Sequence, residues 1–185
     1  MPTPWSPASA LVRWPPLITC AGSGIGGSRD SNTIATAAQR FDGYAQALEK
    51  AEVQADPLIV RHGLRIIDAA AEAATDLICL PDPPTAIFAS QNLVTIGTVK
   101  ALKEAGQQDR MALVGFDDFV LADVLVPGVT VITQDTMQLG RLAAQLLFAR
   151  LDGDVSPART HVVPTGMVIR GSGEIRPAAS MAVGG

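Results

Sequence analysis

Two adjacent carboxylates, Asp117 and Asp118, directly follow an apolar run that is predicted to form a strand. Carboxylates that are held close together can share a proton and serve in acid–base chemistry. Consecutive side chains diverge in direction, however, so a helix-capping or turn role is favoured for this pair. Their position still matters, because ligands of open α/β sheets bind at the carboxyl ends of strands. Arg40 and Gln91 lie at other such ends or on the helices beside them.

A glycine-rich segment, residues 22–27 (GSGIGG), follows another predicted strand. Such a turn lets backbone N–H groups approach a dinucleotide pyrophosphate, and the segment resembles the opening of short-chain dehydrogenases. Those enzymes need a tyrosine with a lysine four positions later, but the only tyrosine, Tyr44, has Leu48 at that distance. A polar stretch, residues 28–32, also separates the last glycine from the next helix. A flexible loop is therefore favoured, and an NAD(P)-dependent short-chain oxidoreductase is the alternative function.

Other catalytic and metal chemistry has little support in the sequence. The two histidines, His62 and His161, lie in unrelated segments, and no GxSxG nucleophile turn occurs. Cys20 and Cys79 sit in apolar runs without a CxxC pair, which favours buried, reduced thiols in the cytosol over a disulfide or zinc site. We therefore expect no catalytic residues, no metal and no cofactor.

The composition indicates a globular chain that is a poor nucleic-acid binder when taken alone. Of its 185 residues, 48% are hydrophobic and 17% are charged. The chain has 14 basic and 18 acidic residues, which gives a net charge of -4. No basic run provides the attraction that drives nucleic-acid binding. Charged residues or prolines interrupt every apolar stretch before it reaches membrane-spanning length, so no membrane contact is expected. Residues 1–16 are interpreted as a disordered leader and residues 178–185 as a frayed tail.

Apolar runs alternate with segments of helical period along most of the chain, which predicts an α/β protein with a mostly parallel sheet flanked by helices. Helical periodicity also predicts that Gly106 caps the end of one helix in a left-handed conformation. The expected strands cover residues 17–21, 58–60, 85–89, 111–116, 129–133 and a last extended stretch at 162–169. The expected helices cover residues 38–48, 66–77, 92–105, a short one at 121–125, and 136–151.

Several motifs together resemble the lactose-repressor type (LacI/GalR) of transcriptional regulator. They are RFDGY at 40–44, PTAIFASQNLVTIG at 84–97, VGFDD at 114–118, VTVITQD at 129–135, LGRLAA at 139–144 and VIRGS at 168–172. The resemblance implies an effector domain like the periplasmic sugar-binding proteins, with two α/β lobes around a small ligand. It also implies an N-terminal helix-turn-helix that binds an operator as a dimer.

From the sequence before Leu17 we expect neither that helix-turn-helix nor a first lobe in this chain. On the resemblance, residues 17–133 form the second, effector-binding lobe, and residues 134–177 supply a crossover helix and strand to an incomplete first lobe. The predicted helix at 136–151 would then lose much of its packing surface, which favours self-association. DNA would be bound only through the absent helix-turn-helix.

The resemblance assigns a ligand site to five residues. Arg40 matches the effector-binding arginine, and Asp117 matches the acidic residue that accepts hydrogen bonds from sugar hydroxyls. Phe116 is expected to stack on an apolar sugar face. Gln91 stands where the family commonly has Asn, and Asn92 is expected to share its role. Arg65 is weighed as a further pocket residue, with a solvated helix arginine as the alternative.

We therefore interpret the sequence as the effector-sensing and dimerisation domain of a cytoplasmic LacI-type regulator, not an enzyme, with a sugar or sugar-like ligand. A stand-alone periplasmic sugar carrier is disfavoured because the chain lacks a signal peptide of the usual type. The apolar cluster of Leu121, Val124 and Leu125 is the expected homodimer interface. Its alternative is a short helix that covers the sheet with these same side chains.

Overall fold

The computed structural model describes residues 17–20, 35–53 and 56–176, and of residues 17–20 and Ala35 it describes the backbone alone. The predicted leader at 1–16, the glycine-rich segment at 22–27 and the tail at 178–185 lie outside the described residues. So does the side chain of Cys20.

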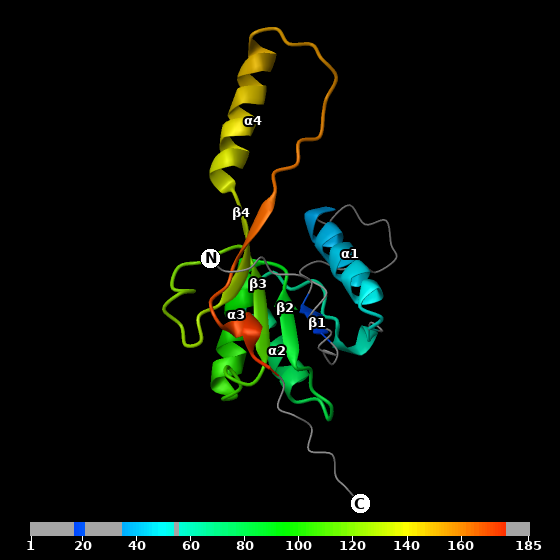
Figure 1. The fold of residues 1–185 in the computed structure, drawn as a ribbon, viewed down its shortest axis with the longest axis vertical. Coiled ribbons are helices and arrows are strands. Elements are labelled where there is room, and N and C mark those ends of the chain that lie inside the picture. Colours follow the sequence, from blue (N-terminus) through cyan, green and yellow to red (C-terminus); the bar gives the residue numbers. More distant parts are fainter. Residues whose placement is uncertain (1–16, 21–34, 54–55, 177–185) are drawn as a thin grey trace, which may run out of the picture.

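The described residues form one sheet with the strand order β1-β2-β3-β4-β5 (Figure 1). Strands β1 (Leu17–Cys20), β2 (Ala86–Ala89), β3 (Ala112–Phe116) and β4 (Thr130–Gln134) run parallel. Strand β5 (Thr165–Val168) is antiparallel to β4. The expected mostly parallel α/β sheet is therefore confirmed, and the carboxyl ends of the parallel strands meet at one edge.

Four α-helices and two 3-10 helices accompany the sheet in the described residues. They are α1 (Ala35–Lys50), η1 (Pro57–Ile59), α2 (Ile67–Ile78), α3 (Asn92–Glu104), α4 (Thr136–Leu151) and η2 (Ser172–Glu174). Helix α3 packs on β2 and β3, and α2 packs on α3. The core lies between these two helices and the sheet, and its buried side chains include Leu77, Ile87, Val94, Leu102, Leu113 and Val131.

Small residues let α2 and α3 approach closely. A Cβ added at Gly97 would overlap the carbonyl oxygen of Ile67 and would lie 2.7 Å from the Cβ of Ala70. The end of α3 is set by Gly106, whose φ of +63° is the left-handed conformation predicted for it. These two glycines fix how α3 packs and where it ends, and α3 begins beside the candidate site.

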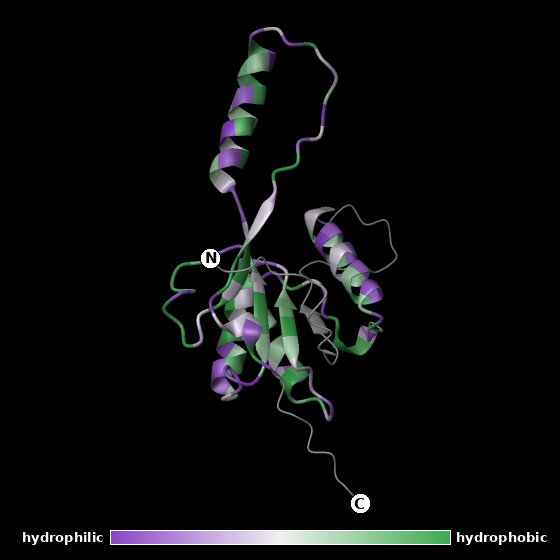
Figure 2. Cartoon of the chain, viewed as in Figure 1, coloured by the Kyte–Doolittle hydropathy of each residue, from purple (hydrophilic) through white to green (hydrophobic). Residues whose placement is uncertain are grey.

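Helix α4 projects away from the sheet, with β4 and β5 as its stem (Figure 1). None of its residues is buried. Hydrophobic and hydrophilic residues are interspersed along the helix (Figure 2). The large exposed hydrophobic residues of α4 are Met137, Leu139, Leu146, Leu147, Phe148 and Leu151. An apolar surface of this kind normally packs against another element.

The structure corrects four of the sequence expectations. The predicted strand at 58–60 is replaced by η1, because Asp56 accepts a hydrogen bond from the N–H of Leu58 and Pro57 is preorganised for a first helical position. The predicted helix at 121–125 is a series of turns, because Leu121 has a φ of +76°, which interrupts a right-handed helix. Cys79 ends α2 as an exposed free thiol rather than a buried one. The extended stretch at 162–169 contains a strand only at Thr165–Val168.

Candidate functional site

Polar residues gather at the edge where the parallel strands end. Ser90 and Gln91 follow β2, Asp117 follows β3, and Gln134 is the last residue of β4. Helix α1 brings Arg40 to the same edge, where its Nη1 donates a hydrogen bond of 2.7 Å to the carbonyl oxygen of Ser90. The sheet therefore supplies the positions, and α1 supplies the positive charge.

The guanidinium of Arg40 stacks over the ring of Phe116, with 3.7 Å between its central carbon and the ring centroid. This distance is well within the range of a cation–π contact. Partial burial lowers the pKa of Arg40, and the charge of Asp117 opposes that shift. Arginine remains protonated at any physiological pH. The site thus contains a fixed, half-buried cation with an aromatic support.

Phe116 is 8% exposed, and one face of its ring is covered by Arg40. The ring has little free surface, so the stacking on a sugar that the resemblance implied would involve the guanidinium rather than the ring. Phe116 lies within the candidate site as a support for Arg40.

Asp117 has an unusual backbone conformation for a residue with a side chain. Its φ is +66°, and its N–H donates a hydrogen bond of 2.8 Å to the carbonyl oxygen of Ile132 in β4. Its Oδ1 accepts a hydrogen bond of 2.6 Å from Nε2 of Gln134. Asp and Asn tolerate the left-handed region better than most residues, and such strain is often found at functional sites.

The other carboxylate, Asp118, forms an ion pair that holds two segments of the fold together. Arg170 binds it with two hydrogen bonds, Nη1 to Oδ1 at 2.8 Å and Nη2 to Oδ2 at 2.6 Å. These bonds lower the pKa of Asp118, helped by the N–H of Phe119 and opposed by burial. The two adjacent carboxylates therefore diverge, as the sequence predicted, and they do not form a proton-sharing pair.

Gln91 and Asn92 lie at the start of α3, and both are half-buried. Gln91 is the N-cap residue, but its side chain makes no cap hydrogen bond, while its carbonyl oxygen accepts from Thr95. Oδ1 of Asn92 accepts from the N–H of Leu93. Ser90, the residue before them, contacts Arg40, and the exposed Arg65 lies just before α2.

Gln134 is the site residue that the sequence interpretation missed. It was part of the VTVITQD motif but was not singled out, because an uncharged amide has no strong chemical signal of its own. Its position at the end of a predicted strand was the available signal, since the same position drew attention to Gln91 and Asp117.

The expected interface residues lie on the turns after β3. Leu121 is 60% exposed and Val124 is 68% exposed, and neighbouring Val120 and Val126 are exposed as well. Leu125 is half-buried and packs against the core. The alternative that Leu121 and Val124 cover the sheet is therefore wrong, and the two side chains belong to an exposed apolar surface.

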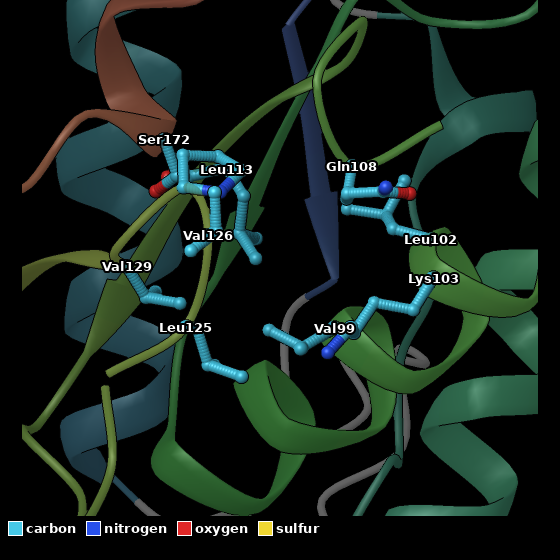
Figure 3. A pocket seen from close by; sticks show the side chains of 10 residues that line it. Val99, Leu102, Lys103, Gln108, Leu113, Leu125, Val126, Val129 and Ser172 are labelled. Carbon is cyan, nitrogen blue, oxygen red and sulfur yellow. The ribbon is translucent and has the colours of Figure 1, made fainter. Parts of the chain in front are cut away.

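A small, partly open cavity lies between α3 and the segment that precedes β4 (Figure 3). Its volume is about 20 Å³, which suits one water molecule and excludes a sugar. The lining side chains come mainly from hydrophobic residues, with Lys103, Gln108 and Ser172 as polar members. The cavity is thus a packing feature and not the ligand site.

The described part of the chain contains neither a candidate metal cluster nor a helix that could span a membrane. Among those residues, no group of three or more His, Cys, Asp or Glu side chains is arranged to hold a metal ion. None of the described helices is long and apolar enough to cross a membrane.

Comparison with known proteins identifies the family. The family described as a periplasmic binding protein-like domain matches residues 18–173. The repressor CytR of Escherichia coli K12 is 30% identical over 135 residues, which cover 72% of this chain and 40% of CytR. The regulator CelR of Thermobifida fusca is 29% identical over 137 residues, which cover 73% of this chain and 40% of CelR.

A solved complex of the regulator CelR with cellobiose has the same fold, with a TM-score of 0.73 at 29% identity over 85% of this chain and 46% of that chain. The chain thus spans less than half the length of these relatives, which are transcriptional regulators rather than enzymes. With the motifs and the sheet topology, these matches show that the chain belongs to the periplasmic-binding-protein-like domains of LacI/GalR-type transcriptional regulators.

Proposed function

We propose that this chain binds a sugar or sugar-like effector at the strand edge formed by Arg40, Asp117 and the start of α3. The observation that carries the proposal is the placement of Arg40, which is hydrogen-bonded to the carbonyl oxygen of Ser90 and stacked on Phe116, the residue directly before Asp117. A cation and an anion side by side offer donors and acceptors together. Neutral, hydroxyl-rich molecules need such a mixed surface, because each hydroxyl both donates and accepts.

Each residue has a distinct part in the proposed site. Arg40 donates hydrogen bonds through the N–H groups that Ser90 does not use, and Asp117 accepts through Oδ2. The side-chain amides of Gln91 and Asn92 complete the polar wall. The similar regulator CelR was solved with cellobiose, which supports a carbohydrate as the ligand class.

The regulatory role proposed for the chain follows from its relatives. Ligand binding would shift the population between an operator-binding and a released state of a whole regulator. The chain carries a net charge of -4, and we propose that DNA is contacted by a separate module. A cytoplasmic location and a non-enzymatic role follow from the same proposal.

We propose two assemblies for the apolar surfaces. The exposed residues Val120, Leu121, Val124 and Val126 form a homodimer contact around a two-fold axis. Helix α4, in which no residue is buried, packs within a first lobe, so that residues 17–133 and 134–177 belong to different lobes.

The proposed function is tested by sugar binding to the purified chain. Saturation-transfer NMR with ribose, glucose and cellobiose should detect binding of at least one sugar, and Arg40→Met and Asp117→Asn should each weaken it by about tenfold or more. The matched controls are Arg141→Met on α4 and Asp109→Asn in an exposed turn, which should leave binding unchanged. Saturable binding of NADH with no sugar binding would instead favour the oxidoreductase alternative.

A further inference from the structure

Gln134 connects the candidate site to the point where the chain leaves the sheet. It is the last residue of β4, it is half-buried, and it pairs with Thr165 of β5. Asp135, the next residue, caps α4 by accepting a hydrogen bond from the N–H of Gln138. The side chain of Gln134 turns back toward Asp117 and donates the hydrogen bond of 2.6 Å to its Oδ1.

Asp117 needs such a partner because its backbone alone does not fix its carboxylate. The φ of +66° and the hydrogen bond to Ile132 hold the main chain of Asp117 against β4. The side chain still rotates about two bonds, and a nearby cation such as Arg40 would draw the carboxylate into a direct ion pair. Arg40 instead donates to the carbonyl oxygen of Ser90, and Asp117 accepts from Gln134.

Resting on the proposed function, we propose that Gln134 is a positioning residue that keeps the Asp117 carboxylate aimed at the ligand and out of an ion pair with Arg40. No described residue donates a hydrogen bond to Oδ2 of Asp117, so one oxygen is held and the other is left for the ligand. An amide suits this task because it donates without adding charge. A lysine at the same place would neutralise Asp117 and compete with the ligand.

The proposal makes Gln134 act through Asp117, whereas a structural role at the base of α4 would not depend on Asp117. A double-mutant cycle separates these possibilities. Cellobiose affinity is measured for the full chain, Gln134→Met, Asp117→Asn and the double variant. Gln138→Met, on the exposed first turn of α4, is the matched control, and circular dichroism verifies folding.

We expect Gln134→Met to weaken cellobiose binding about tenfold in the wild-type background and less than about twofold in the Asp117→Asn background. An equal loss in both backgrounds would overturn the proposal. Gln134→Asn, which shortens the side chain by one methylene, replaces Gln134→Met if that variant does not fold.

A second measurement needs no ligand. The side-chain amide resonances of Gln134, assigned from the spectrum of Gln134→Met, should move on Asp117→Asn and stay in place on Asp109→Asn. If cellobiose does not bind the wild-type chain, the cellobiose form of the proposed function fails while this measurement still decides the positioning role. Resonances of Gln134 that do not respond to Asp117→Asn would refute that role.

Discussion

The guanidinium of Arg40 rests on the ring of Phe116, although one residue comes from α1 and the other from the end of β3. The same guanidinium is tied to the carbonyl oxygen of Ser90 after β2. Two contacts, one with β3 and one with the segment after β2, thus restrain a side chain that would otherwise have many rotamers. Preorganisation of this kind lowers the entropy cost of binding a ligand.

The first prediction concerns the ring of Phe116, which supports the guanidinium of Arg40. Phe116→Leu should reduce ligand affinity several-fold, because a cation–π contact contributes roughly 0.5–2 kcal/mol. It should also lower the free energy of unfolding by about 1 kcal/mol through the lost ring volume. Binding titrations and urea unfolding measure the two effects. Phe119→Leu, at a half-buried position outside the stack, should lower stability without the loss of affinity, and an equal loss of affinity there would contradict the prediction.

The second prediction concerns acid. Because the hydrogen bonds from Arg170 lower the pKa of Asp118 below 3.8, the pair stabilises the fold fully above that pH. The contribution is lost as the pH falls through the folded-state pKa. Asp118→Asn should therefore lower the free energy of unfolding by about 0.5–1 kcal/mol at neutral pH, the upper range for partly exposed pairs.

Urea unfolding at pH 7 and at pH 3 tests this dependence. The difference between wild type and Asp118→Asn should shrink at the lower pH. Asp109→Asn is the control, and it should show no such difference at either pH. If the difference in the free energy of unfolding between wild type and Asp118→Asn grows in acid, the contact with Arg170 does not stabilise the fold in the way proposed.

The third prediction compares two threonines whose hydroxyl groups are buried. Oγ1 of Thr85 is buried and has no hydrogen-bond partner in the described structure, while Oγ1 of Thr98 donates a bond of 2.8 Å to the carbonyl oxygen of Val94. Thr85→Val should raise the free energy of unfolding by up to about 1 kcal/mol, because it removes an unpaired hydroxyl without changing the shape. Thr98→Val should not stabilise the chain. Thermal or urea unfolding measures both variants. If Thr98→Val stabilises the chain more than Thr85→Val does, the unpaired hydroxyl of Thr85 is not destabilising.

The fourth prediction concerns self-association. Leu121 is exposed, so Leu121→Glu should leave the chain folded. In a symmetric contact the added charge faces its own copy and repels it, so the variant should sediment as a monomer while wild type forms a dimer. Val155→Glu, at an exposed position beyond α4, is the control. A dimer that survives Leu121→Glu would exclude this surface.

The sequence predicted the features that local patterns determine. Helix α4 begins and ends at the predicted residues, Thr136 and Leu151, because a run of helix-forming residues without proline follows the capping residue Asp135. Gly106 ends α3 as expected. The family was also recognised from its motifs. These features depend on neighbouring residues, which periodicity and capping rules describe well.

Contacts between distant segments could not be predicted in the same way. The bond from Gln134 to Asp117, the stack of Arg40 on Phe116 and the clamp of Arg170 on Asp118 all join separate elements. The turns at Leu121 were misread as a helix because apolar spacing alone does not reveal a positive φ. The ligand, interface and domain assignments remain predictions.

The projection of helix α4 away from the sheet has a consequence for hydrogen exchange. With no buried residue in α4, the backbone amides of that helix in this chain alone are protected only by its own hydrogen bonds. An isolated helix of its 16 residues is marginally stable in water. The amides of α4 should therefore exchange rapidly for deuterium through local opening of the helix. The amides of β3, buried in the sheet, should exchange only when the whole domain unfolds.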